Sequence, residues 1–429
     1  MNLSSKTLIA RMARMLSAVG LALLLHAPAS VAWAADTDGD GIPDDDEALI
    51  GGDPMHKDIF VECDYMRHDL NNDSDADDPG EHTHELKAAA VAELISVFAM
   101  APVSNPDATP GIALHIDLDE ALPEQRFLDF TSRANGDNFF DLKSAHFDFA
   151  NRAPYFHYCI LAHDASEEAG STSGYSEIFG NDFMVSLGSW PDENGILVGT
   201  VKDQTGAFLH EVGHTLGLDH GGGDLIPPSQ RVKNHKPNYL SVMNYSFQMT
   251  GIDGHFDFSR AALPTLDESN LNEAAGILPS TDRTRHFCKS TRKFVGRVGP
   301  ANIDWNCKPS AAVVRENING DRNFLGQQLF TTLEGYNDWD NLRYDFTTSS
   351  VYDSSAGAGF GQHPGYFGAF RPSDTTSSRG VDREQESSFQ EGRCAQFTTV
   401  NRVGKLLKII SRTRNANADS IGEACRENN

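Results

Sequence analysis

The stretch HEVGHTLGLDH, residues 210–220, decides how this chain of 429 residues is interpreted. Apolar residues at helical spacing precede and enter it, so we expect a helix across residues 206–216. Residues four apart project from the same face of a helix, so His210 and His214 can bind one metal ion from a rigid support. Glu211 lies one position round the helix, where it can act as a general base without being a ligand.

The second half of this stretch completes the predicted metal site. Gly217 tolerates a left-handed backbone and lets the chain leave the helix sharply, after which His220 returns as a third ligand. Three imidazoles leave one coordination position open, which is typical of catalytic rather than structural zinc. The alternative is that the histidines are ordinary polar core residues. The glycine and the third histidine at fixed offsets argue against such a chance match.

A second motif follows at residues 241–245, which read SVMNY. Together the motifs H-E-x-x-H-x-x-G-x-x-H and S-x-M-x-Y resemble the metzincin clan of zinc metallopeptidases, and the second is similar to the form in astacins and serralysins. The resemblance implies that Met243 forms a hydrophobic base beneath the zinc ligands. It also implies that Tyr245 is a weak extra ligand or a donor to the transition-state oxyanion. Gly221, after the third histidine, does not match the usual residue of a named family, so the resemblance extends to the clan only.

The resemblance implies an α+β fold of the metzincin-like zincin type. An α/β-type upper subdomain would hold a twisted mixed sheet and the active-site helix, above an irregular lower and C-terminal region. Residues 183–190 would be the edge strand, along which a protein or peptide substrate pairs. The residue pattern itself predicts strands at 58–66, 112–118 and 155–162 and a helix at 85–100.

The activity that these motifs predict is that of a secreted zinc-dependent endopeptidase. Glu211 would take the proton of a zinc-activated water as this water attacks the scissile carbonyl. One rival is a non-catalytic adhesion or binding protein in which zinc and calcium only hold the fold. Another is a zinc hydrolase that acts on a non-peptide amide.

An acidic loop at residues 36–47, DTDGDGIPDDDE, predicts a calcium site. It resembles the calcium loops of thrombospondin type 3 repeats and of EF-hands, with Gly41 at the sharp turn. A solvated acidic leader is the alternative, and a second acidic cluster at residues 69–78 lacks regular spacing. The expected calcium ligands are Asp36, Asp38, Asp40, the carbonyl of Ile42, Asp44 and Glu47.

The first 35 residues have the pattern of a secretory signal peptide, with a basic start, a short apolar run and Ala32-Trp33-Ala34 as the cleavage site. The expected segments are a signal peptide at 1–35, a calcium-loop leader at 36–50, a catalytic domain at 51–265 and an irregular region at 266–429. The last contains a Ser/Gly-rich surface loop and a basic amphipathic helix. For that helix, packing against its own domain and membrane binding are both open.

Six cysteines remain beyond the leader, and an even number in an exported chain favours disulfides. Proximity along the chain suggests the pairs Cys288–Cys307, Cys394–Cys425 and Cys63–Cys159.

The formal net charge is −26. Such a charge opposes binding to nucleic acid or to anionic membranes through the general field of the protein. No later segment is long and apolar enough to span a bilayer, and we expect a monomer.

Overall fold

The computed structural model describes residues 35–70, 80–130, 138–165, 172–296, 298–308, 313–322 and 327–352. A six-stranded mixed sheet forms its centre, in the order β2-β1-β4-β6-β5, with β3 also paired to β1. Four strands run parallel, whereas β2 and β5 are antiparallel to their neighbours. The strands are β1 Asp58–His68, β2 His82–Thr83, β3 Ala113–Pro123, β4 Phe156–Ala162, β5 Gly174–Ser176 and β6 Asp182–Ser186.

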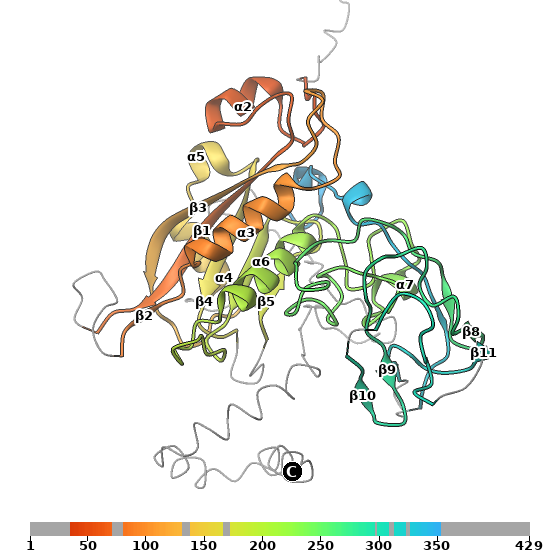
Figure 1. Cartoon of the computed structure of the whole chain (residues 1–429). Helices are drawn as coiled ribbons and strands as arrows, with labels where there is room; N and C mark the ends of the chain where they lie inside the picture. The colour runs from red at the N-terminus through yellow and green to blue at the C-terminus, as the bar shows by residue number, and fades with distance from the viewer. Residues whose placement is uncertain are drawn as a thin grey trace, which may run out of the picture.

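Two long helices cover one face of this sheet. Helices α3 (Ala88–Ala99) and α6 (Val201–Thr215) lie side by side against it (Figure 1). Phe98 of α3 and Phe208 and Val212 of α6 are fully buried in one apolar cluster with residues from β1, β4 and β6. Helix α6, which carries the metal-binding motif, is therefore held rigidly between α3 and the sheet.

The opposite face of the sheet is covered by shorter helices and aromatic side chains. Helix α4 (Phe139–His146) packs Phe139 and Phe140 against Tyr158 in a second apolar cluster, and α5 (Phe149–Arg152) lies beside it. Because both faces are covered, every residue of β4 and β6 is buried. Continuous apolar runs rather than alternating ones are expected in such strands.

The chain after the two motifs forms short two-stranded ladders around a third apolar cluster that includes Trp305. This cluster also contains Phe247 and Ile252, while Trp339 packs into the main cluster beside α3 and α6. The remaining elements are α2 Asp44–Ile50, α7 Pro228–Arg231, β7 Leu266–Asp267, β8 Leu271–Asn272, β9 Phe287–Cys288, β10 Lys293–Phe294, β11 Val313–Val314, β12 Thr332–Leu333 and the 3-10 turns η1 Trp339–Asn341 and η2 Phe346–Thr348. Residues on both sides of position 265 thus share their cores.

The last described residues contact earlier segments of the chain, including the acidic N-terminal loop. Arg343 N donates a hydrogen bond to Leu216 O at 2.9 Å, and the hydroxyl of Tyr352 donates to Ala153 O at 3.0 Å. At Gly41 the backbone has a φ of +89°, and an added Cβ would lie 3.0 Å from Asp345 Cα. The acidic N-terminal loop and the C-terminal part of the described chain are therefore in direct backbone contact.

The general expectation of an α+β protein is confirmed, and the expected edge strand is wrong. Residues 183–190 overlap β6, but β6 pairs on both sides, with β4 and with β5. Among the described strands, β5 pairs only with β6 and forms the edge. Three residues, Gly-Tyr-Ser, are too few to show the alternation by which a strand is found in sequence.

The cysteines follow the expected pairing in part. Cys288 and Cys307 are joined by a disulfide, which confirms that pair. Cys63 and Cys159 are opposite each other in β1 and β4, but they are buried free thiols, so that expected bond is not formed. Cys394 and Cys425, the signal peptide up to residue 34, the acidic cluster at 71–78 and the C-terminal helix lie outside the described residues.

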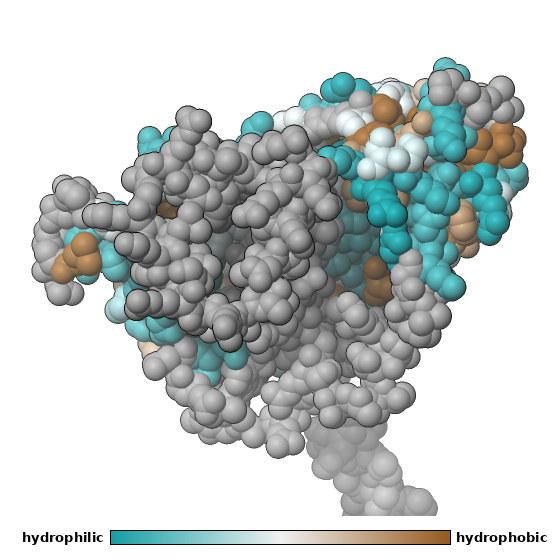
Figure 2. Space-filling view, turned by 90° about the horizontal axis from the view of Figure 1, so that it is seen from below, coloured by the Kyte–Doolittle hydropathy of each residue, from teal (hydrophilic) through white to brown (hydrophobic). Residues whose placement is uncertain are grey.

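On the face that Figure 2 shows, the described residues are largely hydrophilic, with apolar residues in separate groups. Within the described ranges, no helix combines the length and the apolar character that a membrane crossing requires.

Candidate metal centre

Helix α6 begins with a capping box that fixes where its later turns lie. Thr200 Oγ1 accepts from Asp203 N at 3.2 Å, and the Asp203 carboxylate accepts from Thr200 N at 3.0 Å. These bonds satisfy donors that the first turn would otherwise leave without partners. The helix then runs unbroken to Thr215, which places His210 and His214 on one buried face.

The two helical histidines are oriented by backbone carbonyls. His210 Nδ1 lies 2.8 Å from Val242 O, and His214 Nδ1 lies 2.8 Å from Leu218 O. A carbonyl only accepts, so each ring carries its proton on Nδ1 and presents the lone pair of Nε2 to the site. This second layer of hydrogen bonds is the usual way in which proteins orient metal-binding imidazoles.

The two Nε2 atoms lie 3.1 Å apart. Two neutral rings protonated on Nδ1 would place two lone pairs against each other at this distance, and a cation between them would relieve the repulsion. Zinc–nitrogen bonds of 2.0–2.1 Å at tetrahedral angles separate two ligand atoms by about 3.3 Å, so the spacing fits zinc.

The third histidine is brought back by the turn at Gly217, whose φ of +87° confirms the left-handed conformation expected there. Leu218 N donates to Gly213 O at 3.0 Å, which ends the helix and reverses the chain. Ligand nitrogens of His210, His214 and His220 all lie within 4.8 Å of one another, and all three rings are buried. The structure thus brings together the three residues that the motif predicts as ligands.

The second motif packs beneath these ligands. Val242, whose carbonyl orients His210, donates its N–H to Asp257 O at 3.0 Å, and Met243 is fully buried. A Cβ added at Gly213 would lie 2.5 Å from Met243 Sδ. The motif accepts any residue at this position, but Gly213 lets Met243 approach the backbone of α6. Met243 therefore lies where a hydrophobic base would be.

Glu211 packs against β5, whereas Tyr245 lies beside His220. Glu211 is buried, and Ser176 of β5 donates a hydrogen bond to its carbonyl at 2.9 Å. Gly174 of β5 lies beside the Glu211 carboxylate, since an added Cβ would come within 2.5 Å of Oε1. The ring of Tyr245 lies 4.4 Å from the ring of His220, measured between centroids. Sequence patterns did not indicate that β5 reaches the site.

The acidic N-terminal loop folds around its own carboxylates. Gly39 N and Gly41 N donate to the carboxylate of Asp36, at 2.7 and 3.1 Å. Asp36, Asp38 and Asp40 bring carboxylate oxygens within 4.8 Å of one another. Such a turn matches the first half of the expected calcium loop.

The second half of the loop differs from the expected pattern. Glu47, in α2, forms a group with Asp40 and with Asp58 of β1. Asp44 belongs to neither group, because its carboxylate accepts from Thr37 N and Thr37 Oγ1, both at 2.7 Å. Ile42 N donates to the Asp40 carboxylate at 2.9 Å, so this residue lies beside the group.

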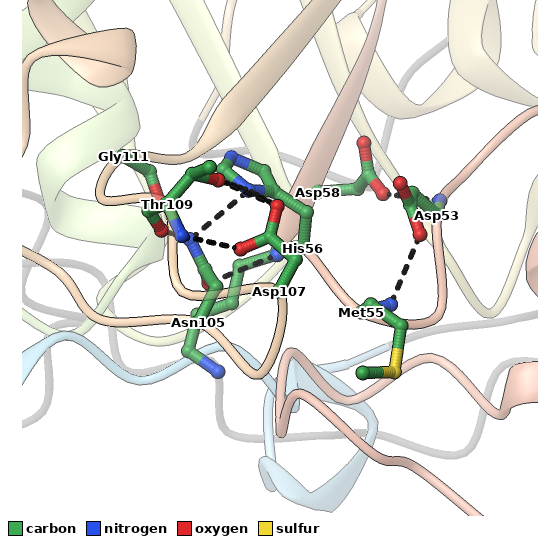
Figure 3. A network of polar contacts seen from close by, with 9 residues as sticks. Asp53, Met55, His56, Asp58, Asn105, Asp107, Thr109 and Gly111 are labelled. Carbon is green, nitrogen blue, oxygen red and sulfur yellow. Dashed lines mark hydrogen bonds and ion pairs between the residues drawn. The ribbon is translucent and has the colours of Figure 1, made fainter.

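Asp58 is a candidate ligand that the sequence motif did not include. Its carboxylate accepts from Asp53 N at 2.8 Å and from the His115 ring, and Figure 3 shows it facing Asp53 at the start of β1. The same view shows a neighbouring network of hydrogen bonds among His56, Asp107, Thr109 and Asn105. This network connects the segment before β1 to the loop before β3. An aspartate directly before the apolar run Ile59-Phe60-Val61 was the available signal.

Burial without partners makes this carboxylate group a fit for a cation. Both side-chain oxygens of Glu47 and Oδ2 of Asp38 are buried with no hydrogen bond. Burial, with neighbouring carboxylates, raises the pKa of Asp40 to about 7 and that of Glu47 to about 8. Oxygen-only ligands are the preference of calcium.

Comparison with known proteins adds nothing to this geometry, since no family model, curated protein or solved structure matches the chain.

Proposed function

We propose that this chain is a secreted, zinc-dependent endopeptidase of the metzincin type, stabilised by calcium. The observation that carries the proposal is the convergence of the His210, His214 and His220 imidazoles, with the Nε2 atoms of the first two 3.1 Å apart and Glu211 on the same helix. A group of three imidazoles, with no fourth ligand joining it among the described residues, fits catalytic zinc better than structural zinc. Bound zinc would supply Lewis acidity and make a water acidic enough to react near neutral pH.

The residues of the chain would perform the remaining work. Glu211 would accept the proton of the attacking water and deliver it to the leaving amine. Its burial against β5 keeps bulk water from competing for that proton. Tyr245, beside His220, would donate to the oxyanion or act as a weak ligand.

Strand β5 supports a peptide as the substrate. It is antiparallel to β6 and forms the edge of the described sheet, and Gly174 brings it against Glu211. An extended substrate paired with this edge would be held by main-chain hydrogen bonds, which do not depend on its sequence. Its scissile bond would then pass close to the general base.

Our first prediction tests the general base. Purified Glu211→Ala should retain the zinc content of the wild type and lose nearly all hydrolysis of denatured casein, because the ligands remain and the proton acceptor is gone. The exposed Glu193→Ala is the matched control and should behave as wild type. Zinc is measured by mass spectrometry and cleavage by peptide release.

Near-normal proteolysis by Glu211→Ala would contradict the assigned role. Failure of the zinc-loaded wild type to cleave any denatured protein would favour a rival. That rival is either an adhesion protein held by its metals or a hydrolase of a non-peptide amide.

A further inference from the structure

A second histidine cluster lies where several strands of the sheet end. Glu124 directly follows β3, and His163 directly follows β4. His82 begins β2, and the pairing of this segment with β1 extends to His84, whose N–H donates to Met66 O at 2.9 Å. Residues two apart on an extended chain share a face, so both imidazoles of this His-x-His pair point the same way.

The four side chains converge on one point. His84 Nε2 lies 3.2 Å from His163 Nδ1 and 3.2 Å from Glu124 Oε2. His82 Nε2 and His163 Nδ1 lie 2.7 and 3.5 Å from the same oxygen. These separations bracket the spacing of about 3.3 Å expected between ligands of a tetrahedral zinc ion. His84 is buried, and the other three side chains are half-buried, with exposed fractions of 15% for His82, 13% for Glu124 and 15% for His163.

Hydrogen bonds alone do not account for this arrangement. Three imidazole nitrogens surround Glu124 Oε2, but one carboxylate oxygen has only two lone pairs to share. His82 Nε2, although 2.7 Å from that oxygen, is not aligned with it and makes no hydrogen bond. Each of the four side chains offers one ligand atom, and these atoms all lie within 4.8 Å of one another, as ligands of one ion do.

We infer that His82, His84, Glu124 and His163 form a second metal site, built for zinc or a similar divalent transition metal. Three imidazoles with a single carboxylate favour such an ion over calcium or magnesium, which prefer oxygen. Four protein ligands close a tetrahedral site, so the ion is structural rather than catalytic. The site shares no residue with the group of His210, His214 and His220.

The position of the site indicates which segments of the chain the ion would hold together. It ties the segment 82–87 to the ends of β3 and β4. Lys87, in that segment, donates its N–H to Gln204 Oε1 of α6 at 2.8 Å and its ammonium to Gly199 O at 3.0 Å. The ion therefore anchors the connection into α3 and, through Lys87, the start of the helix that carries the proposed zinc ligands.

A packing feature of β6 supports a preorganised site. Gly188, just beyond this strand, donates its N–H to His163 O at 2.6 Å. An added Cβ there would lie only 2.4 Å from the His163 ring. The absence of a side chain at this position leaves room for the ring in its observed orientation.

The test separates the two metal sites by removing each in turn from the untagged, full-length chain. Wild type should bind about two zinc ions tightly, since both sites present convergent imidazoles. The variant His210→Ala/His214→Ala should keep one. Loaded with cobalt(II), it should show the intense visible absorption of a four-coordinate ion. Adding His163→Gln to this variant should abolish that absorption.

His146→Gln is the matched control. His146 also contacts a glutamate, with Nδ1 2.9 Å from Glu120 Oε1, but it belongs to no group of metal-ligating residues among those described. This variant in the same background should retain the cobalt spectrum. Glu124→Gln, which keeps the side-chain volume, should weaken cobalt binding at least tenfold, and it serves as the test if His163→Gln does not fold.

Two results would overturn the inference. One is a folded His210→Ala/His214→Ala variant, with an unchanged circular dichroism spectrum, that binds no cobalt. The other is equal cobalt binding by folded chains with and without the Glu124→Gln change, which would mean that the cluster is an ion-free network of imidazoles and carboxylate. Failure of the proposed protease function would appear differently, as unchanged zinc content when His210 and His214 are replaced.

Discussion

At the scale of single residues, the site depends on two glycines as much as on its charged groups. Gly213 lets Met243 approach α6, and Gly174 lets β5 lie against Glu211. Neither position carries chemistry of its own. Each matters because a side chain there would displace an atom next to the proposed zinc ligands or the general base.

Gly174→Ala should lower kcat at least tenfold while zinc remains bound. The added Cβ would meet Glu211 Oε1 at 2.5 Å and Met184 O at 2.5 Å, so the carboxylate and the strand must both move. A small displacement of a catalytic group can cost about 100-fold. Gly299→Ala is the control, because a Cβ there meets no atom within 4 Å. Unchanged kcat in Gly174→Ala would show that Glu211 is not held by this contact.

A buried carboxylate in β1 predicts a dependence of stability on pH. Burial raises the pKa of Asp64 to about 6, although its carboxylate accepts hydrogen bonds from the Tyr158 hydroxyl at 2.6 Å and from Glu120 N at 3.3 Å. A pKa higher in the folded than in the unfolded chain means that the protonated form stabilises the fold. This contribution is complete below pH about 4 and is lost as the pH rises through about 6.

Asp64→Asn should remove this dependence, since an amide cannot ionise. Its oxygen can accept from Glu120 N, and its NH2 group can donate to the Tyr158 hydroxyl oxygen once that hydroxyl turns. At pH 8 the variant should be more stable than wild type by roughly 2–3 kcal/mol, and near pH 4 the two should be alike. Urea unfolding at the two pH values measures the difference. A variant less stable than wild type at pH 8 would contradict the predicted sign.

At the scale of elements, sequence patterns found what is long and regular. The strands at 58–66, 112–118 and 155–162 became β1, β3 and β4, and the helix at 85–100 became α3. The three zinc-ligand candidates came together because helical spacing and one glycine turn place them by local geometry. Contacts between segments that are distant in sequence leave no such local pattern. Strand β5, the approach of Asp58 to Glu47 and the cluster around Glu124 all depend on the tertiary fold.

The acidic loop shows the same limit within one element. Spacing selected Asp36, Asp38, Asp40 and Glu47, which belong to the two carboxylate groups, but it also included Asp44, which bonds to Thr37. Asp58 lies outside any linear motif, because it belongs to β1 and reaches the loop only in the folded chain. A local motif thus predicts the existence of such a site better than its complete set of ligands.

Calcium should raise the melting temperature by several degrees at millimolar concentration, through preferential binding to the folded chain. Asp58→Asn should reduce this shift, because it removes a carboxylate from the group with Asp40 and Glu47. Asp44→Asn is the control: it makes the same change of charge within the acidic loop but outside both carboxylate groups. Scanning calorimetry with and without chelator measures the shifts. Equal effects of the two variants would contradict the assignment of Asp58.

At the scale of the whole molecule, three apolar clusters are joined through the segments around the proposed zinc site. The residues after the second motif share a core with residues beyond 265, and Trp339 returns to the helices over the sheet. The described part of the region after residue 265 therefore belongs to the same folded unit as the sheet and its helices. Its described part cannot be removed without exposing apolar surface beside α3 and α6.

The contact between the acidic loop and residues 343–352 has a mechanical consequence. Because Gly41 touches Asp345 and Tyr352 holds Ala153, a pulling force applied at residues 36 and 352 would first load this junction. The sheet and its helices would bear no tension until the junction gave way. A calcium ion bound in the loop would strengthen this junction. The force needed to unfold the molecule would therefore rise with the calcium concentration.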